Sequence, residues 1–158
     1  MIDFIDDFLP YSEYEYVVNH CLNSPYYYGE KDYKDTRPVG MISRIEKNDS
    51  IFKIFNKEIG DKVKKVKNLS IQRMYINCFA PEEKTFFHRD GKHGITCLFY
   101  ANTDYEINSG GETQLIVDNL GINILPIPNR LAFFDANILH KATSFTNKHR
   151  FTIVVKYV

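Results

Sequence analysis

Six closely spaced β-strand signals fill the second half of this sequence and limit the folds open to it. The runs are rich in β-branched and aromatic residues, and Gly, Asn, Asp and Pro separate them. They cover residues 71–79, 95–101, 113–117, 122–127, 131–134 and 151–158. No helix of useful length fits between them, which excludes a parallel α/β sheet. The pattern therefore predicts an antiparallel β-sandwich or barrel.

Residues 1–67 show a mainly helical pattern instead. They begin with a short apolar and acidic segment, residues 1–8. A helix is predicted over residues 10–22, where apolar side chains recur at helical spacing. A second helix is predicted over residues 50–66, with Ser50 as its cap and lysines opposite an apolar stripe. Both helices are expected to cover a sheet.

The chain is expected to form one domain, residues 1–158. Residues 1–67 would supply the helical cover and a candidate lid loop, and residues 68–158 the β core. At 158 residues it is long enough to bury a core without disulfide or metal staples. Its 20 Lys and Arg balance its 20 Asp and Glu. This balance removes the electrostatic argument for a nucleic-acid or anionic-membrane partner.

Three features point to a cytoplasmic protein without a membrane partner. No apolar run approaches the ~18 residues of a membrane-spanning helix. Residues 1–10 carry three Asp and no Lys or Arg, unlike a signal peptide. The three cysteines are widely spaced and form no C-x-x-C pair, which fits reduced thiols.

Residues 26–40, between the two predicted helices, form a long loop with many aromatic and basic side chains, Tyr33 among them. Loops of this length are usually functional or mobile. Tyrosine offers a broad, flat contact face at low entropic cost. We interpret this loop as a lid over the site, with Tyr27, Tyr28 and Arg37 as substrate-binding residues.

His88 and Asp90 stand two residues apart, which on a strand directs both side chains to one face. Such a pair can bind a metal ion, but this composition predicts about 0.35 His-x-Asp triplets by chance. His140 follows a predicted strand, where the next turn of a barrel could return it beside the pair. Two His and one Asp form a facial triad, which suits non-haem Fe(II) and leaves three coordination positions open. A 2-oxo acid can occupy two of them and dioxygen the third.

Arg150 lies ten residues after His140. Strand alternation puts it on the face opposite to the residues that would pack beneath the helices. An inward Arg is costly unless an anion meets it, and a guanidinium can clamp a carboxylate with two hydrogen bonds. We interpret Arg150 as the clamp for a dicarboxylate cosubstrate. The alternative is an internal ion pair with a residue such as Asp135.

In combination, these positions resemble a known family. The matching segments are Phe79-x-Pro81, His88-x-Asp90, Thr96-x-x-x-Tyr100-x-Asn102, Gly110-Gly111-Glu112-Thr113, His140 and Arg150. They resemble the Fe(II)/2-oxoglutarate-dependent dioxygenases, in particular the prolyl 4-hydroxylase-like branch. The resemblance covers residues 71–158 well and residues 1–22 loosely.

The resemblance implies a mainly β protein with α-helices: a double-stranded β-helix, or cupin-like jelly roll, flanked by N-terminal helices. It implies Fe(II) and 2-oxoglutarate as cofactors, with ascorbate as a stimulant. By the same resemblance His88, Asp90 and His140 bind the iron. Arg150 binds the distal carboxylate of 2-oxoglutarate, and Thr96 lies beside that carboxylate. No catalytic residue is expected beyond the metal centre.

Phe79 departs from the family pattern, which commonly has Tyr nine residues before the first iron ligand. The hydrogen bond that this Tyr gives the cosubstrate is therefore absent. Tyr75 and Asn77 lie on the same strand face and could replace it, so we place both in the cosubstrate pocket. Ordinary polar positions on a barrel strand are the alternative.

The expected activity is hydroxylation of a C–H bond with release of succinate and CO₂. A peptidyl or prolyl substrate and a small molecule both remain open, as does the oligomeric state. An AlkB-like oxidative demethylase is supported only by Asn77 and is opposed by the neutral charge. A cupin-like module that binds a metal or ligand without turnover would have no need of Arg150.

Overall fold

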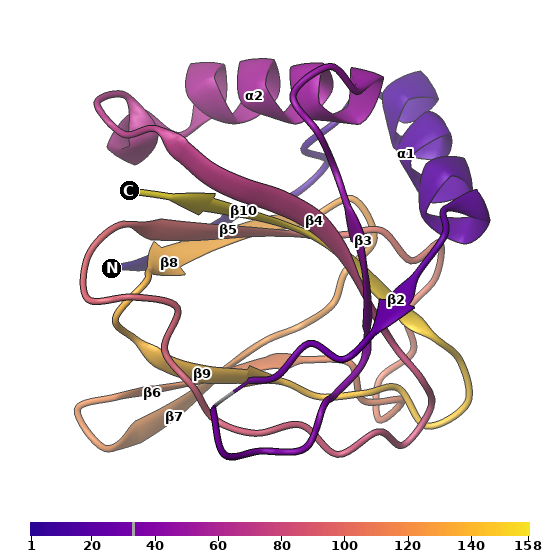
Figure 1. Cartoon of the computed structure of the whole chain (residues 1–158), viewed down its shortest axis with the longest axis vertical. Coiled ribbons are helices and arrows are strands. Elements are labelled where there is room, and N and C mark those ends of the chain that lie inside the picture. Colours follow the sequence, from indigo (N-terminus) through magenta and orange to yellow (C-terminus); the bar gives the residue numbers. More distant parts are fainter. Residues whose placement is uncertain (33) are drawn as a thin grey trace.

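A computed structural model describes residues 1–32 and 34–158; Tyr33 of the predicted lid loop lies outside the described residues. Within these residues, two antiparallel sheets face each other, and the helices pack on the outer side of the larger sheet (Figure 1). The arrangement is a double-stranded β-helix flanked by N-terminal helices. The predicted fold class is confirmed.

The larger sheet combines strands from both ends of the described chain. From edge to edge it consists of β1 (Ile2–Ile5), β8 (Leu131–Asp135), β5 (Ile95–Tyr100), β10 (Arg150–Tyr157), β4 (Ile71–Phe79), β3 (Met41–Arg44) and β2 (Tyr27–Tyr28). The smaller sheet consists of β7 (Leu120–Ile124), β6 (Thr113–Val117) and β9 (Leu139–Ala142). The helices are α1 (Tyr11–Asn23), α2 (Ser50–Lys62) and the short 3₁₀ helix η1 (Lys64–Val66).

Three parts of the predicted element order need correction, and one is the strand β9, which the sequence pattern does not predict. Residues 1–67 are not only a helical cover, because they contribute β1, β2 and β3 to the larger sheet. These strands have two to four residues, too few to show a period in the sequence. Ser50 does not cap α2: Asp49 is the N-cap residue, and its carboxylate accepts a hydrogen bond from the Glu46 N–H at 2.7 Å instead.

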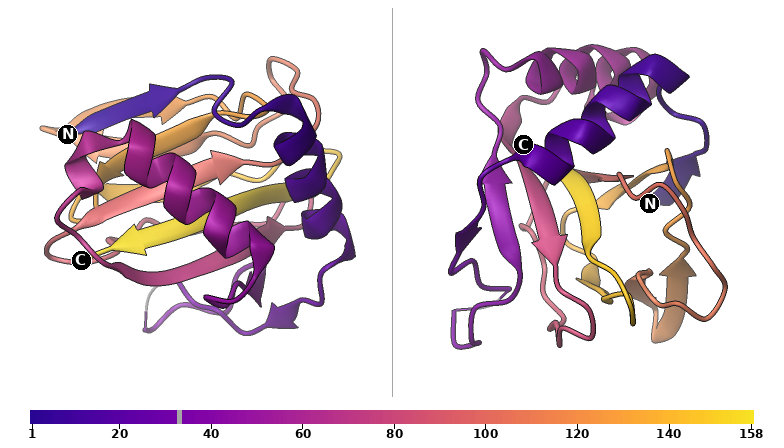
Figure 2. Two further views of the ribbon diagram at one scale, coloured as in Figure 1. Left: turned by 90° about the horizontal axis from the view of Figure 1, so that it is seen from above. Right: turned by 90° about the vertical axis from the view of Figure 1, so that its right-hand side faces the viewer.

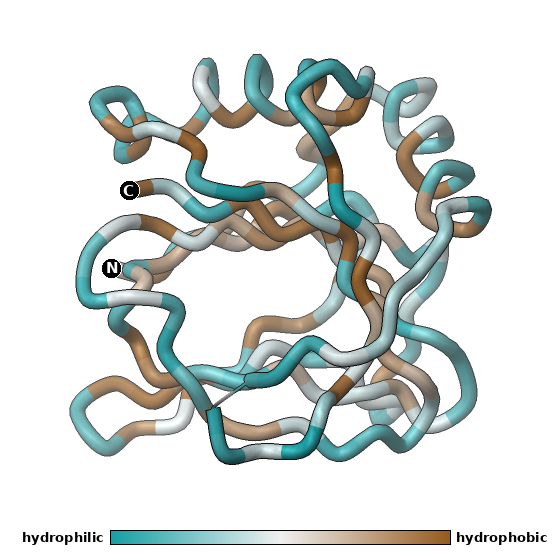
Figure 3. The backbone as a smooth tube through the Cα atoms, viewed as in Figure 1, coloured by the Kyte–Doolittle hydropathy of each residue, from teal (hydrophilic) through white to brown (hydrophobic). Residues whose placement is uncertain are grey.

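The main hydrophobic core lies between the helices and the outer face of the larger sheet. Ile51, Phe55 and Ile59 of α2 are fully buried there. The ring of Phe55 packs edge-on against Phe99 of β5, with 5.1 Å between the centroids. Both helices lie across the same face of the sheet (Figure 2), and their hydrophobic turns face it (Figure 3). None of the helices in the described part of the chain is long and apolar enough to cross a membrane.

β10 separates this core from the interior of the barrel, as alternation predicts. Ile153 and Val155 belong to the core beneath the helices. Arg150, Thr152 and Val154 line a cavity between the two sheets. The strand therefore presents apolar side chains to the helices and includes polar ones on its other face, where the site lies.

A tight turn before β5 requires glycine at position 94. Gly94 has a φ of 103°, and a Cβ added to it would lie 2.0 Å from the carbonyl oxygen of Tyr157. Because backbone must move to relieve this contact, Gly94→Ala is expected to lower the free energy of unfolding by more than about 2 kcal/mol. Thermal unfolding followed by circular dichroism would then show a melting temperature at least about 4 °C below that of the wild type.

Gly60→Ala is the matched control for this substitution. Gly60 lies in α2, and nothing lies within 4 Å of a Cβ added there. Because Ala is the better helix former, the free energy of unfolding of this variant is expected to rise by up to about 1 kcal/mol. Equal stability of Gly94→Ala and the wild type would contradict the close approach of Gly94 to β10.

Candidate metal centre

Three side chains with metal-binding atoms meet between the two sheets. His88 and Asp90 lie in the segment before β5, and His140 lies on β9. One ligand atom from each lies within 4.8 Å of the other two. Nε2 of His88 is 3.7 Å from one Asp90 carboxylate oxygen, and Nε2 of His140 is 3.6 Å from the other. These separations are close to those of donors that share one ion at about 2.1 Å each.

The backbone explains how two distant histidines come together. His88 and His140 form an isolated antiparallel bridge, in which each N–H donates to the other's carbonyl oxygen at 2.9 Å. Residues paired in this way point their side chains to the same side. The two imidazole rings accordingly lie 4.5 Å apart. The barrel fold therefore pairs two residues that lie 52 positions apart in the sequence.

Both imidazoles are held with one nitrogen turned toward the interior. Nδ1 of His88 lies 3.1 Å from the carbonyl oxygen of Phe86, and Nδ1 of His140 lies 2.9 Å from that of Ile138. A carbonyl can only accept, so in the neutral ring each Nδ1 carries the proton and each Nε2 keeps its lone pair for a metal. Burial lowers the pKa of His140, which favours the neutral, ligating form.

Asp90 is held as a carboxylate. Its two oxygens accept hydrogen bonds from Thr96 Oγ1 and from Lys156 Nζ, both at 2.6 Å. Burial alone would raise the pKa of the Asp90 carboxyl, but the charge of Lys156 and these hydrogen bonds hold it below its usual range. The triad therefore offers two neutral nitrogens and one anionic oxygen, a donor set suited to Fe(II).

The triad lines a cavity of about 260 Å³ that Arg150 also lines. Arg150 is fully buried and donates from Nε to the Gly111 carbonyl oxygen at 2.8 Å and from Nη2 to Thr113 Oγ1 at 3.0 Å. It forms no ion pair with any residue that the structure describes. The internal pair with Asp135 is excluded, because that carboxylate binds the amino group of Met1.

Burial lowers the pKa of the Arg150 guanidinium, because it disfavours the charged form. A bound anion would remove much of this cost. Thr113, which Arg150 contacts, pairs with Ala142, two residues beyond His140 on β9 and about 7 Å along the strand. A five-carbon dicarboxylate can bridge such a distance between a metal at the triad and the guanidinium. The residues present therefore fit both Fe(II) and 2-oxoglutarate.

Tyr75 and Asn77 both line the cavity, on the strand next to β10. Oδ1 of Asn77 is buried without a hydrogen-bond partner among the described residues. Since either end of the amide can face the cavity, Asn77 can donate to or accept from a bound group. The register pairs Asn77 with Thr152 and Tyr75 with Val154, which places both on the wall between the two ends of the cavity.

The structure does not bring Thr96 to Arg150. Thr96 faces the interior, as expected, but it donates to the Asp90 carboxylate and not to a group beside Arg150. Its partner on β10 is Lys156, six residues from Arg150 and roughly 20 Å along the strand. Thr113 takes the place beside the guanidinium instead.

The structure does not bring the three predicted lid residues to the metal cavity. Tyr27 and Tyr28 are 65% and 69% exposed on the edge strand β2, and they line a neighbouring hollow rather than the metal cavity. Arg37 is exposed and also lies outside that lining. The same loop does reach the cavity, but through Glu30, Lys31, Asp32 and Val39.

Lys156 and Thr113 are the site residues that the sequence analysis missed. Lys156 shares the alternation of Arg150 on β10, so this signal was present in the sequence. Thr113 closes the Gly110-Gly111-Glu112-Thr113 segment. Gly111 has a φ of 87°, and a Cβ there would lie 2.4 Å from the Phe145 ring. Glycine at position 111 therefore allows the Phe145 ring to pack closely against the backbone there, beside the carbonyl oxygen that accepts from Arg150.

Comparison with known proteins extends these observations. No protein-family model and no curated protein matches the sequence. Among solved structures, the chain is similar over 99% of its length to a prolyl hydroxylase from Trichoplax adhaerens in complex with a hypoxia inducible factor peptide fragment. The TM-score is 0.77, the sequence identity is 18%, and 82% of that chain is covered.

Two further structures give the same result, each over 99% of this chain. A prolyl-4-hydroxylase from Pseudomonas putida has a TM-score of 0.73 at 12% identity, with 91% of that chain covered. The viral collagen prolyl hydroxylase of Paramecium Bursaria Chlorella virus-1, in its 2-oxoglutarate complex, has a TM-score of 0.71 at 15% identity, with 94% covered. The chain therefore has the double-stranded β-helix fold shared by 2-oxoglutarate- and Fe(II)-dependent oxygenases of the prolyl hydroxylase type.

Proposed function

We propose that this protein is an Fe(II)- and 2-oxoglutarate-dependent dioxygenase that hydroxylates a C–H bond and releases succinate and CO₂. One observation carries the proposal. A complete two-histidine, one-carboxylate triad and a fully buried arginine without an acidic partner among the described residues line the same cavity. The triad suits the metal, and the arginine suits the second carboxylate of the cosubstrate.

Each side chain has a distinct task in this proposal. His88, Asp90 and His140 would hold the metal beside the cavity that they line. Arg150 and Thr113 orient the distal carboxylate of 2-oxoglutarate, with Asn77 and Tyr75 on the adjoining wall. Bound Fe(II) with 2-oxoglutarate supplies the oxidising chemistry. The two sheets enclose the reacting groups and limit the access of water.

We propose that the substrate is a peptide, such as a prolyl peptide, or a small molecule. The peptide bound in the Trichoplax adhaerens structure supports the first of these classes. The neutral net charge opposes an AlkB-like demethylase acting on nucleic acid. We also propose that residues 1–158 act as one domain, which is supported by the strands that residues 1–67 add to the larger sheet.

The proposal is tested by anaerobic titration of the metal-free protein with Fe(II) and then 2-oxoglutarate. A weak visible charge-transfer band that saturates at one equivalent of each is expected. Release of succinate with a panel of prolyl peptides and small acids then tests turnover. A folded protein without the band would be a metal- or ligand-binding module, and the dioxygenase proposal would fail.

A further inference from the structure

The inner face of the larger sheet carries cationic side chains beside the triad. Lys156 on β10 lies directly opposite Arg73 on β4. Arg44 on β3 lies opposite Tyr75, two residues farther along β4. Side chains of directly opposed residues share a face of the sheet. Lys156, Arg73 and Tyr75 accordingly all line the metal cavity.

These cations have few anionic partners. Lys156 is 16% exposed, and its carboxylate partner is Asp90, a residue of the triad. Arg73 is 42% exposed and pairs with Glu30 at 2.7 Å. The side chain of Arg44 forms no hydrogen bond or ion pair with the residues that the structure describes. Arg73 therefore becomes available to a ligand when Glu30 moves away, and Lys156 lies beside it.

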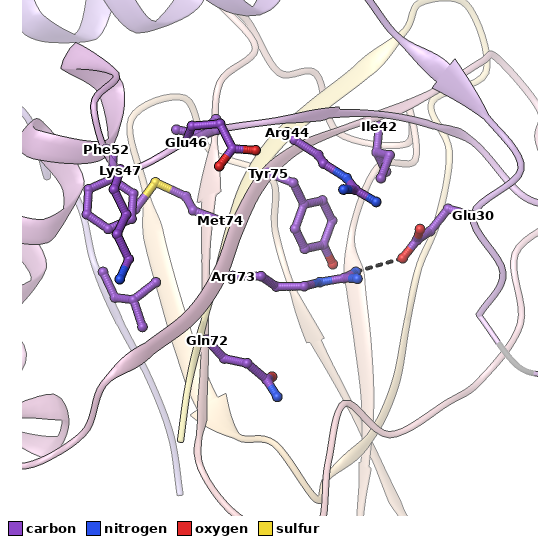
Figure 4. Close-up of a pocket in the computed structure, with 12 residues that line it drawn as sticks. Glu30, Ile42, Arg44, Glu46, Lys47, Phe52, Gln72, Arg73, Met74 and Tyr75 are labelled. Carbon is purple, nitrogen blue, oxygen red and sulfur yellow. Dashed lines mark hydrogen bonds and ion pairs between the residues drawn. The ribbon is translucent and has the colours of Figure 1, made fainter.

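Tyr75 connects the cations into one surface. Its ring centroid lies 4.2 Å from the Arg73 guanidinium carbon and 5.8 Å from Lys156 Nζ. A second cavity of about 320 Å³, drawn in Figure 4, shares Glu30, Arg73 and Tyr75 with the metal cavity. In Figure 4 the side chains of Arg73 and Tyr75 extend to the same side of β4, toward Glu30. A group bound there would border both cavities.

The metal cavity is also more basic than the chain as a whole, which is neutral. Five cationic and three acidic side chains line it: Lys31, Arg73, Arg89, Arg150 and Lys156, against Glu30, Asp32 and Asp90. The charges of Fe(II) and of the 2-oxoglutarate dianion cancel each other. An excess of two positive charges therefore remains when both are bound, and it favours an anionic third ligand.

We propose that the substrate carries a carboxylate, which Arg73 and Lys156 bind at this end of the barrel. This assignment rests on the proposed function and names the substrate class. A guanidinium presents paired N–H donors to a carboxylate, and the lysine adds a point charge. Arg150 lies six residues from Lys156 on β10, so the two carboxylate sites are separate. Both a free amino acid and the C-terminal carboxylate of a peptide have this chemistry.

Glu30 occupies the proposed place of the substrate carboxylate. Its Oε1 accepts from Arg73 Nη2, as a substrate oxygen would. Glu30 belongs to the loop before β3, and Asp32 of this loop also accepts a hydrogen bond, from the Phe86 N–H at 2.9 Å. A substrate carboxylate must therefore displace Glu30. Removal of the Glu30 charge should strengthen carboxylate binding, whereas removal of the Arg73 charge should weaken it.

The test uses small probes on protein saturated anaerobically with Fe(II) and 2-oxoglutarate, so that Arg150 is occupied. N-acetylglycine represents a peptide C-terminus, and glycine represents a free amino acid. N-acetylglycinamide and glycinamide are the matching compounds in which a neutral amide replaces the carboxylate. Ligand-observed NMR is expected to show at least one acid binding at least tenfold more tightly than its amide. Which acid binds better distinguishes the two sources.

Three variants locate the binding. Arg73→Gln is expected to lose at least tenfold in affinity for the acid, and Glu30→Gln is expected to gain. Arg130→Gln is the matched control, since Arg130 pairs with Asp6 and does not line the metal cavity. Equal affinity for acid and amide, no effect of Arg73→Gln, or tighter binding of inorganic phosphate would overturn the assignment.

The same samples separate this inference from the proposed function. The charge-transfer band reports whether iron and cosubstrate bind, and the NMR titration reports carboxylate binding independently. A band with no preference for the acid refutes only the carboxylate site. Loss of the band in wild-type protein refutes the dioxygenase, whatever the probes show.

Discussion

Replacement of His140 by alanine is expected to abolish the metal centre. His140 supplies one of three ligand atoms, and the structure describes no other His, Cys, Asp or Glu in a cluster with the remaining two. Two ligands hold Fe(II) far more weakly than three, so we expect at least a 100-fold loss of Fe(II) affinity. Anaerobic titration should show no charge-transfer band at wild-type concentrations, and succinate release should fall to background.

The fold of this variant needs a separate check, because His140 is buried and its ring packs edge-on against Phe134 at 4.7 Å. Circular dichroism with thermal unfolding gives this check, and His140→Gln repeats the experiment with a bulkier side chain. His93→Ala is the matched control: His93 is exposed, precedes β5 and does not line the metal cavity. If folded His140→Ala keeps the wild-type affinity for Fe(II), the triad is not the metal site.

The sequence predicted the chemistry of the site better than it predicted where each site residue lies along its strand. His88 and Asp90 were recognisable because their spacing has a meaning in any extended segment. The direction of Arg150 followed from alternation alone. Thr96 shows the limit of this argument. Alternation gives the face of a side chain, but its position along the barrel depends on the register between β5 and β10, which pairs Thr96 with Lys156.

The N-terminal part of the chain shows a second limit. β1 and β3 have four residues each and pair with strands distant in the sequence, β8 and β4, whereas the two-residue β2 pairs with β3. Such short segments carry no period of their own. The length of the loop before β3 predicts a functional segment, but Tyr27 and Tyr28 lie on an exposed edge strand. Glu30 and Asp32 reach the cavity because β3 lies beside β4.

Replacement of Arg150 by methionine is expected to separate cosubstrate binding from stability. Hydrogen bonds to charged groups contribute about 1.5–3 kcal/mol each. Loss of a two-bond clamp should therefore lower the affinity for 2-oxoglutarate at least 100-fold. Iron binding should persist, because the triad is intact and Arg150 contacts none of its members by a hydrogen bond. The charge-transfer band should then require far more 2-oxoglutarate to appear.

Without cosubstrate, the free energy of unfolding of Arg150→Met is expected to lie within about 1 kcal/mol of the wild-type value. The variant loses the bonds to Gly111, Thr113 and Thr152, but it also loses the cost of a fully buried cation that forms no ion pair with the described residues, and methionine fills a similar volume. Arg130→Met is the matched control, because that arginine pairs with Asp6 and lies outside the cavity lining.

Because a ligand that binds only the folded protein raises its stability, the difference in 2-oxoglutarate binding between the variants can be measured as a difference in stability. Wild-type protein with Fe(II) should gain about 2.7 kcal/mol of stability at a 2-oxoglutarate concentration 100 times its Kd. Arg130→Met should gain the same, and Arg150→Met almost nothing at that concentration. A large loss of stability in Arg150→Met without cosubstrate would instead identify Arg150 as a structural residue whose hydrogen bonds support the barrel. An undiminished gain would mean that the cosubstrate carboxylate binds elsewhere, and Lys156 and Arg73 are among the other cations that line the cavity.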